Sequence, residues 1–456
     1  MVIGYNLKGN ITSLSDYKVG LSIKRNSKRL RDFVEGMTLK EKLLNAKGMI
    51  MVHQPTNTSI AHFNFIHSQH FFPLSILDYA VAIQNLVCRN IPSLPILSID
   101  SHDYGPCDFR CLDCLAEETR TWGEKKLGFK NFDPVHYEAV LTEISRYSRE
   151  RGCESVRFEM SGEGNPDMYS HRARIIRHAK EKCNMGVVYV SSGSRLTKES
   201  IDALVECASY IRISFPGLNN DAYSIYSRQA GNRKDQFTYD AALRLLETLT
   251  NRRAQCGRDG ELLIGIRTCM RPENEGWYNK TALRIGELGA DSFQIVKILV
   301  PIGYNVQDFP LSNETIYELQ EVKRKKGDGK LMHVQVPQKL DYMYYSREID
   351  ELIKPAECFS SSVSPILYGP HLVICTHWGK ITDIENSHYG VITGEPGQLN
   401  NIIAGNRANK IRDHVPSRCN DCCSIYDNLI MSAIKAQLSL AKDPNEVGFY
   451  LTYYPK

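Results

Sequence analysis

Short apolar runs alternate with longer amphipathic stretches between about residue 94 and residue 300. Six runs have the length and the near-continuous apolar character of strands covered on both faces: 94–100, 154–162, 186–193, 210–215, 262–270 and 292–299. Segments with helical periodicity lie between them, for example 133–152 and 238–253. Strands that alternate with helices predict βα units and a parallel sheet, and therefore an α/β fold. In such folds ligands bind where the strands end and the loops begin.

The pattern divides the chain into three regions. Residues 1–93 carry no assignable motif and form an N-terminal extension, and residues 94–322 hold the alternating strands and helices. A charge run with glycines, "KRKKGDGK" (323–330), predicts a solvated linker and marks the next boundary. Residues 323–456 are rich in loops and cysteines, and they end in the helix-like stretch 427–442.

Composition narrows the function only slightly. The 456 residues are 42% hydrophobic and 24% charged, which is ordinary for a folded protein, and the net charge of +4 argues for neither a nucleic-acid nor a membrane partner. The longest apolar stretch, 71–87, is interrupted by Asp78 and Gln84 and predicts an amphipathic helix. The N-terminus lacks a signal-peptide core, so a cytoplasmic location is expected. There, fourteen cysteines favour metal binding or catalysis over disulfides.

Three cysteines, Cys107, Cys111 and Cys114, follow the first predicted strand directly. Thiolates hold iron–sulfur clusters, usually four for a cubane cluster. Three ligands leave one iron open, and an open coordination position distinguishes a reactive metal site from a structural one. The alternatives are a zinc ion with a distant fourth ligand and three unrelated buried thiols.

This C-x3-C-x2-C spacing after a first strand resembles the motif of the radical SAM superfamily. The resemblance implies a partial (β/α)6 barrel, a [4Fe-4S] cluster with one open iron, and S-adenosyl-L-methionine bound to that iron. An electron from a flavodoxin or ferredoxin-like donor would cleave the sulfonium and give a 5′-deoxyadenosyl radical that abstracts hydrogen. The family usually has an aromatic residue before the last cysteine, where this chain has Asp113.

The second predicted strand ends in "SGEGNP", which is similar to the glycine-glycine-glutamate-proline motif of that superfamily. The matching residues are Ser161, Gly162, Glu163 and Gly164. Glycines let the backbone approach a ligand closely, and a glutamate can accept a hydrogen bond from the ammonium group of the cofactor.

Three further residues match cofactor-binding positions of the superfamily. Ser192, after the third strand, matches a residue that binds the ribose or methionyl part. Arg228 matches by its offset the arginine that holds the methionyl carboxylate in the peptide-modifying branch, a role that suits a bidentate guanidinium. Ser214, on the fourth strand, is another candidate. A surface or core role is the alternative for Arg228 and Ser214.

A second group of cysteines follows the predicted barrel: Cys358, Cys375, Cys419, Cys422 and Cys423. The C-x10-G-x5-C spacing around Gly369 resembles the SPASM or twitch auxiliary domain, although the family spacing after the glycine is one residue shorter. The resemblance implies a possible second iron–sulfur cluster held by Cys358, Cys375, Cys419 and Cys422, and a structural zinc is the alternative. Cys375 is also a candidate hydrogen donor, because a thiol has a weak S–H bond. In that case Cys423 or another group would complete the ligand set.

Several polar and aromatic residues lie near these cysteines in the sequence. His371, His377 and His388 flank Cys375 and could act as acids or bases, or could be loop histidines bonded to the backbone. Three tyrosines could line a pocket or pack on the surface: Tyr342, Tyr344 and Tyr345.

The chain's size, single auxiliary region and Cys375 resemble the proteusin-type radical SAM peptide epimerases. This resemblance implies L-to-D epimerisation at Cα of a ribosomal precursor peptide, with Cys375 returning hydrogen on the opposite face and residues 1–93 binding the leader. No net oxidation occurs, so only positioning on two faces is required. The alternatives are a thioether or carbon–carbon crosslinking peptide maturase, a small-molecule enzyme such as an aminosugar dehydratase, dehydrogenase or epimerase, and a metal-stabilised binding protein that keeps the barrel.

Overall fold

The computed structural model describes the central part of the chain most fully. The described residues are 2–5, 11–13, 20–22, 93–102, 107–111, 132–153, 155–161, 164–229, 236–296, 312, 314–319, 333–335, 358, 360–374, 387–418 and 448–452. The predicted amphipathic helix 71–87, the predicted linker 323–330 and the predicted closing helix 427–442 lie outside these residues.

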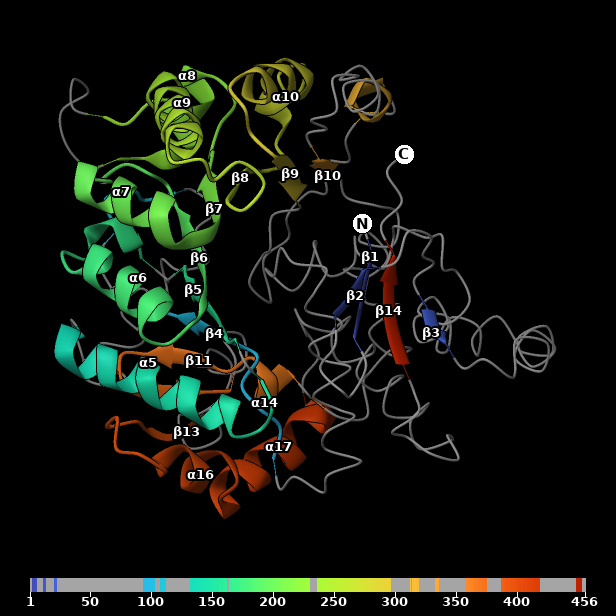
Figure 1. The fold of residues 1–456 in the computed structure, drawn as a ribbon. Coiled ribbons are helices and arrows are strands. Elements are labelled where there is room, and N and C mark those ends of the chain that lie inside the picture. Colours follow the sequence, from blue (N-terminus) through green and yellow to red (C-terminus); the bar gives the residue numbers. More distant parts are fainter. Residues whose placement is uncertain are drawn as a thin grey trace.

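A ten-stranded sheet dominates the described part of the fold, with the strand order β10-β9-β8-β7-β6-β5-β4-β11-β12-β13 (Figure 1). Parallel pairing runs without interruption through β4 (Ser98–Ser101), β5 (Arg157–Met160), β6 (Gly186–Ser191), β7 (Ala208–Ser214), β8 (Leu263–Cys269), β9 (Ser292–Val296) and β10 (His333–Gln335), and β11, described below, adds to it beside β4. The six apolar runs are β4 to β9, so the predicted α/β class with a parallel sheet is confirmed.

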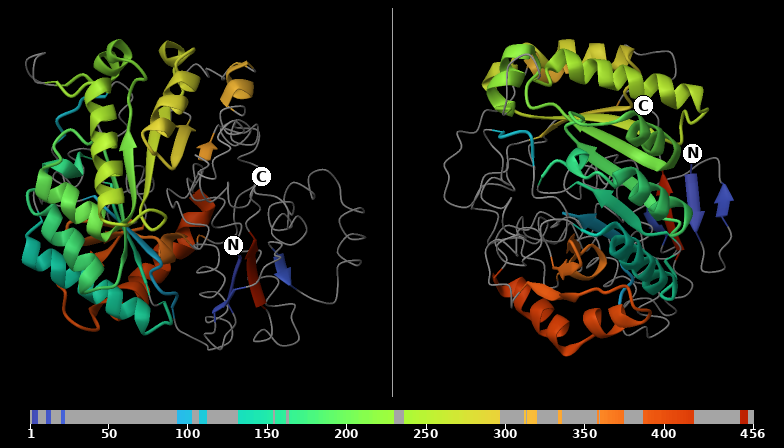
Figure 2. Two further views of the ribbon diagram at one scale, coloured as in Figure 1. Left: turned by 45° about the horizontal axis from the view of Figure 1, so that its top comes forward. Right: turned by 90° about the vertical axis from the view of Figure 1, so that its left-hand side faces the viewer.

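Helices connect these strands and lie on the outer side of the curved sheet (Figure 2). Their bounds are α5 (Pro134–Arg149), α6 (Arg172–Glu181), α7 (Lys198–Cys207), α8 (Asn220–Ser227), α9 (Tyr239–Gln255) and α10 (Tyr278–Glu287), with the 3-10 turns η2 (Pro166–Met168) and η4 (Pro272–Asn274). In α5, α7, α8 and α9 the capping side chain accepts from the backbone amide three positions on, which satisfies one amide that has no partner inside the helix. These caps are Asp133, Thr197, Asn219 and Thr238.

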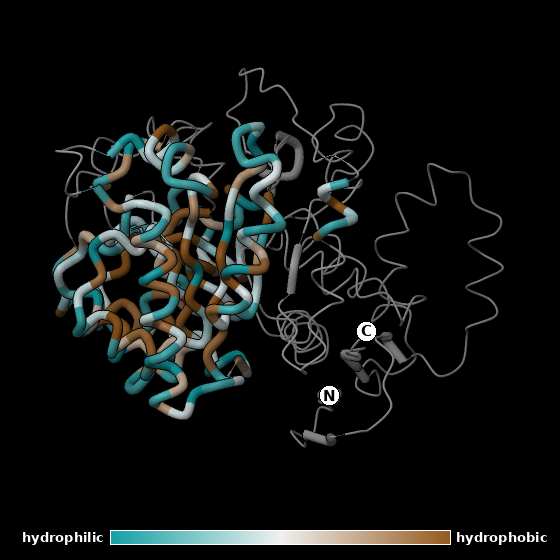
Figure 3. Tube along the Cα trace, turned by 90° about the horizontal axis from the view of Figure 1, so that it is seen from above, coloured by the Kyte–Doolittle hydropathy of each residue, from teal (hydrophilic) through white to brown (hydrophobic). Residues whose placement is uncertain are grey.

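The main hydrophobic core lies between the sheet and these helices, where Figure 3 shows apolar segments gathered inside the fold. Alternate strand residues supply one side of this core, among them Phe158, Tyr189 and Ile211, because successive side chains of a strand point to opposite faces. The intervening residues form the opposite face, which we call the inner face. Val188 and Tyr210 lie there in a small separate cluster.

The segment after residue 358 extends the same sheet. It forms α14 (Ser360–Val363), β11 (Ile366–Tyr368), which is parallel to β4, and the antiparallel strands β12 (His371–Val373) and β13 (His388–Val391). The helices α16 (Gln398–Ile403) and α17 (Asn406–Arg418) follow, and Arg151 beyond α5 donates to Asn400 at 2.7 Å. The domain boundary at residue 323 stays a prediction.

A small antiparallel sheet joins the two ends of the chain. Its strand order is β2-β1-β14-β3, and its strands are β1 (Val2–Tyr5), β2 (Ile11–Ser13), β3 (Gly20–Ser22) and β14 (Gly448–Thr452). Among the helices that the structure describes, none is long and apolar enough to cross a membrane.

Candidate active site

Two of the three predicted cluster ligands, Cys107 and Cys111, are described by the structure, and Cys114 is not. Both thiols are half-buried at the edge of the main core, and neither forms a disulfide. Such thiols, on a loop at the carboxyl end of a strand, have the donor chemistry and access that an iron–sulfur cluster requires, so these residues fit that group. Within the described residues, no three His, Cys, Asp or Glu side chains are grouped to hold a metal ion. The third ligand stays a prediction.

The cysteine loop, residues 107–111, is anchored on α8. Phe109 is 3% exposed, and its ring edge contacts the buried ring of Tyr223 with 6.3 Å between centroids. The backbone amide of Arg110 donates to the carbonyl oxygen of Ser227 at 2.9 Å. Since Ser227 precedes Arg228, this bond brings the predicted carboxylate-binding arginine next to the cysteine loop.

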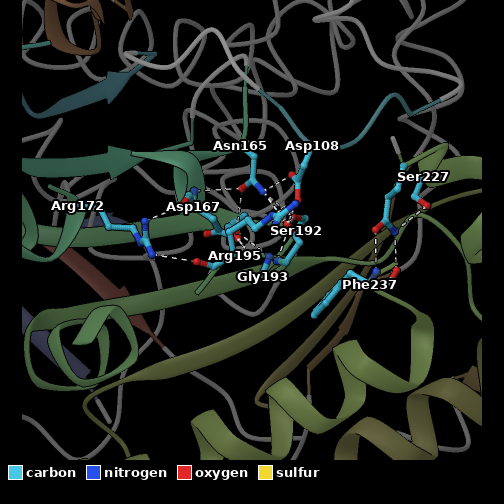
Figure 4. Close-up of polar contacts among 12 residues, drawn as sticks. Asp108, Asn165, Asp167, Arg172, Ser192, Gly193, Arg195, Ser227 and Phe237 are labelled. Atoms are coloured by element: carbon cyan, nitrogen blue, oxygen red, sulfur yellow. Dashed lines mark hydrogen bonds and ion pairs between the residues drawn. The ribbon is translucent and has the colours of Figure 1, made fainter. Parts of the chain in front are cut away.

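Arg228 ends α8 in a left-handed backbone conformation, with φ 40° and ψ 50°. Its amide still donates to the carbonyl oxygen of Ser224 at 3.3 Å, and its side chain is exposed. For a residue other than glycine, this backbone conformation lowers the stability of the folded chain by about 1 kcal/mol. The next residue, Gln229, exchanges side-chain hydrogen bonds of 2.5 and 2.7 Å with the backbone of Phe237 and fixes the turn (Figure 4).

Asp108 joins the cysteine loop to the ends of β5 and β6 (Figure 4). Its Oδ1 accepts from Nδ2 of Asn165 at 2.8 Å. Its Oδ2 accepts from Oγ of Ser194 at 2.7 Å and from Nε of Arg195 at 3.2 Å. The Asp108 side chain is only 12% exposed, so water screens its bonds to Asn165 and Ser194 little, whereas the side chain of Arg195 is exposed. We call these four residues, together with Ser192, the Asp108 network.

Ser192 lies inside this network rather than beside it. Its Oγ accepts from Nδ2 of Asn165 at 3.0 Å and lies 2.9 Å from Oγ of Ser194. Asn165 belongs to the "SGEGNP" motif, is 3% exposed, and caps η2 by accepting from the amide of Asp167. The structure therefore brings the motif after the second strand and the predicted serine after the third strand into one hydrogen-bonded group.

A buried carboxylate, Asp167, holds the same turn from the side of the core. It accepts from Oγ of Ser191 at 2.6 Å, from the hydroxyl of Tyr189 at 2.7 Å and from the amide of Arg195 at 3.3 Å. Burial raises the pKa of Asp167, and the hydrogen bond from Ser191 acts in the opposite direction. The guanidinium of Arg172 donates to the carbonyl oxygens of Asp167 and Arg195, which closes the turn on its outer side (Figure 4).

Ser161, the first residue of the motif, faces β4. Its hydroxyl donates to Oδ1 of Asp100 at 2.5 Å, and Oδ2 of the same carboxylate lies 2.9 Å from Nε2 of His102. The ring of His102 lies 5.1 Å from that of Tyr368 on β11. Gly164 begins the turn that leads to η2, and Gly162 and Glu163 lie outside the described residues.

Two other predicted residues are not part of the Asp108 network. Ser214 ends β7, is half-buried, and pairs in register with Arg267 on β8. Cys358 is half-buried before α14, and its carbonyl oxygen accepts from Oγ of Ser361 at 2.5 Å. Cys375, Cys419, Cys422 and Cys423 lie outside the described residues, so the auxiliary cluster stays a prediction.

His371 and His388 are in direct contact across β12 and β13, with 3.2 Å between Nδ1 of the first and Nε2 of the second. Burial, followed by the charge of His388, lowers the pKa of His371 to about 4, and burial also lowers the pKa of His388. Both rings are therefore neutral near pH 7. Gly369 lies in the turn between β11 and β12 with φ 57°. His377 and the three tyrosines 342, 344 and 345 lie outside the described residues.

Asp108, Ser194 and Arg195 belong to the site but were not predicted from the sequence. Two signals were present: a carboxylate between two motif cysteines, and the last of three hydroxyls in "SSGS". Neither signal indicates which residue the side chain contacts, because the network joins positions up to 87 residues apart.

No protein-family model matches the chain, and no curated protein matches it significantly. Among solved structures, SuiB of Streptococcus suis bound to S-adenosylmethionine has a TM-score of 0.50 at 12% identity, covering 78% of this chain and 77% of SuiB. SuiB bound to the precursor peptide SuiA has a TM-score of 0.50 at 13% identity, covering 77% and 74%. Native anSMEcpe with bound AdoMet and Cp18Cys peptide has a TM-score of 0.47 at 11% identity, covering 73% and 87%. At these identities the likeness to SuiB shows a shared fold.

Proposed function

We propose that this chain is a radical SAM enzyme that modifies a ribosomally made precursor peptide. The observation that carries the proposal is the position of the cysteine loop, which follows the first parallel strand and is bonded through Asp108 to the ends of the second and third. The fold likeness to SuiB, solved with S-adenosylmethionine and with a precursor peptide, supports the same cofactor and a peptide substrate.

The residues at the strand ends divide into ligands and positioning groups. Cys107, Cys111 and Cys114 would hold the [4Fe-4S] cluster, and Asp108 would fix the position of their loop relative to the strand ends. With S-adenosylmethionine bound, the cluster would supply the electron for radical chemistry that removes a hydrogen atom from carbon.

Other residues would bind S-adenosylmethionine itself. Arg228 would hold the cofactor carboxylate through a bidentate pair, and Glu163 would accept from the cofactor ammonium group. Ser192 would contact the ribose or methionyl part. The remaining predicted contacts come from Ser161, Gly162, Gly164 and Ser214.

We further propose that the reaction is L-to-D epimerisation at Cα. Cys375 would lie on the substrate face opposite the cofactor and return hydrogen, so that a C–H bond forms as the S–H bond breaks. The resulting sulfur radical would take one electron from a reduced flavodoxin or ferredoxin-like protein and one proton from solvent. Residues 1–93 would bind the leader, and an auxiliary cluster would use Cys358, Cys419, Cys422 and a fourth ligand.

The test begins with anaerobically reconstituted, reduced protein and S-adenosylmethionine, and measures 5′-deoxyadenosine. Cys111→Ala is the matched variant, since loss of one thiolate should abolish this product. Absence of deoxyadenosine with the wild-type protein, with and without peptide, contradicts the radical SAM proposal.

The type of reaction is tested separately with the peptide encoded by a short reading frame beside the gene, in heavy water. Epimerisation keeps the peptide mass but adds one deuterium for each inverted residue, and chiral amino-acid analysis finds D-residues. A loss of two hydrogens indicates crosslinking, and a loss of water indicates dehydration. Either result overturns epimerisation and leaves the radical SAM assignment intact.

A further inference from the structure

The inner face of the sheet carries charged side chains that the proposed cofactor site does not use. Asp100 pairs in register with Glu159, Glu159 with Val188, and Val188 with Tyr210. These residues therefore lie in one row across β4 to β7. Because side chains alternate along a strand, Arg212, two residues beyond Tyr210, lies on the same face.

Arg212 is buried, with only 5% exposed, and its Nε has no hydrogen-bonding partner among the described residues. Within the same described part of the chain, this is also the case for the Nε atoms of Arg172, Arg253 and Arg271. The strand neighbours explain this, since Arg212 pairs in register with Val190 on one side and Gly265 on the other, and neither has a side-chain acceptor. A guanidinium has five N–H donors, and buried ones are normally paired. The Nε of Arg212 therefore still requires an acceptor.

Glu159, which lies on this face and interacts with the charge of Arg212, does not compensate that charge near neutral pH. Glu159 is completely buried, and burial, followed by the charge of Asp100, raises its pKa to about 8. Arg212 and Arg157 act in the opposite direction through their charges. Glu159 is thus mostly protonated at pH 7. Burial raises the pKa of Tyr210 to about 12, and the charges of Arg212 and of a second cation, Arg267, act in the opposite direction.

We propose that Arg212 binds a carboxylate group of the peptide substrate on the inner face of the sheet. This inference rests on the proposed function. Ser214, two residues further along β7, lies at the strand end where the cofactor is expected, roughly 7 Å away along the strand. A peptide residue bound at the end of β7 would place the carboxylate of an adjacent peptide residue on the guanidinium of Arg212. The planar guanidinium can bind both oxygens of that carboxylate. The group is either an Asp or Glu side chain or the C-terminal carboxylate.

Three small probes test this binding on the full-length protein. N-acetylglutamate α-amide carries a side-chain carboxylate, N-acetylalanine carries a terminal one, and N-acetylglutamine α-amide is the neutral isostere of the first. We expect at least one carboxylate probe to bind about ten-fold more tightly than the glutamine probe, by saturation-transfer NMR titration. The carboxylate probe that shows the preference identifies the source of the group.

Arg212→Gln should remove that preference, and Arg212→Lys should retain only part of it because lysine lacks the planar fork. Arg174→Gln is the matched control, since Arg174 is an exposed arginine that pairs with Glu138 at 2.7 Å outside this face. Circular dichroism checks that each variant is folded. If Arg212→Gln does not fold, the wild-type preference and the Arg212→Lys variant decide the question.

Two results overturn the proposal. One is equal binding of the carboxylate and amide probes by the wild type, or an unchanged preference in Arg212→Gln. The other is a loss of S-adenosylmethionine affinity in Arg212→Gln without a change in probe binding, which would assign the arginine to the cofactor. The probe titration needs no turnover, so its failure is distinct from an absence of 5′-deoxyadenosine formation.

Discussion

Nδ2 of Asn165 donates a 2.8 Å hydrogen bond to Oδ1 of Asp108, and this bond joins the cysteine loop to the turn after β5. The two residues are 57 positions apart, and both side chains are largely buried. The other oxygen of Asp108 accepts from Ser194 and Arg195 in the turn after β6. One carboxylate thus sets the position of the cysteine loop relative to two strand ends.

Replacing Asp108 by alanine should loosen the cysteine loop. We expect Asp108→Ala to lower either iron retention or the rate of 5′-deoxyadenosine formation by about 10- to 100-fold, the range typical of residues that orient metal ligands. Iron per chain after anaerobic reconstitution and the deoxyadenosine rate are the two measurements. The matched control is Asp240→Ala, which removes another carboxylate that accepts from an asparagine, at 2.7 Å from Asn220 on α8. Wild-type iron content and rate in Asp108→Ala would refute this role.

Replacing Arg228 by glycine should change stability and cofactor affinity in opposite directions. Glycine adopts φ 40° without steric cost, so the free energy of unfolding should rise by up to about 1 kcal/mol, partly offset by the entropy of the unfolded chain. The affinity for S-adenosylmethionine should fall about ten-fold or more, since a bidentate contact is lost. Asn184, at φ 54°, is the other described non-glycine residue with positive φ, and Asn184→Gly should leave the affinity unchanged. Urea unfolding and calorimetric titration give the two quantities, and an unchanged affinity in Arg228→Gly would count against the carboxylate contact.

Replacing Gly193 by alanine should destabilise the turn that carries Ser192 and Ser194. Gly193 has φ 80°, and a Cβ there would lie 2.2 Å from Cδ2 of Leu245. Backbone strain and overpacking together should cost about 2–4 kcal/mol. Gly257 has φ 66°, and among the described residues no atom would lie within 4 Å of a Cβ added to it, so Gly257→Ala should cost only about 1 kcal/mol. Urea midpoints compare the two variants, and equal losses would show that Leu245 moves aside freely.

The strands were predictable from the sequence because they are nearly continuous apolar runs bounded by polar turns, as in β6 and β7. The positions of the cysteine loop and of Ser192 at the strand ends follow from the same pattern, since parallel strands bring their carboxyl ends to one edge. The pairing of β11 with β4 did not follow from the sequence. Ile366–Tyr368 is short, and its partner lies more than 260 residues earlier, so no local period encodes the contact.

The polar contacts within the site were the least predictable part. A sequence shows that Asp108 and Asn165 can bond but not that they meet, because their separation depends on how β4, β5 and the loops twist. For Arg212, the sequence did not show that a polar side chain is buried. Arg212 lies in the apolar run "YIRISF", where an arginine interrupts the apolar pattern of the strand. Only the structure shows that Arg212 is buried beside Val190 and Gly265 and that its Nε has no acceptor among the described residues.

The buried carboxyl group of Glu159 should make the stability of the fold fall as the pH rises. Burial raises its pKa from 4.5 to about 8, with Asp100 acting in the same direction. Between these two values the folded chain keeps a proton that the unfolded chain has released. The free energy of unfolding due to this group is therefore fully present below about pH 4.5 and is lost as the pH rises toward about 8.

Glu159→Gln has no proton to lose, so its stability relative to the wild type should increase steadily from about pH 5 to about pH 8.5. Urea midpoints of both proteins across this range measure the difference, and subtraction cancels the titration of other groups. Asp202→Asn is a suitable control, because a hydrogen bond from Lys198 lowers the pKa of Asp202 and its contribution is constant above pH 5. If the Glu159→Gln and wild-type curves stay parallel, Glu159 is already ionised in the folded chain, and it then neutralises part of the charge that we assign to Arg212.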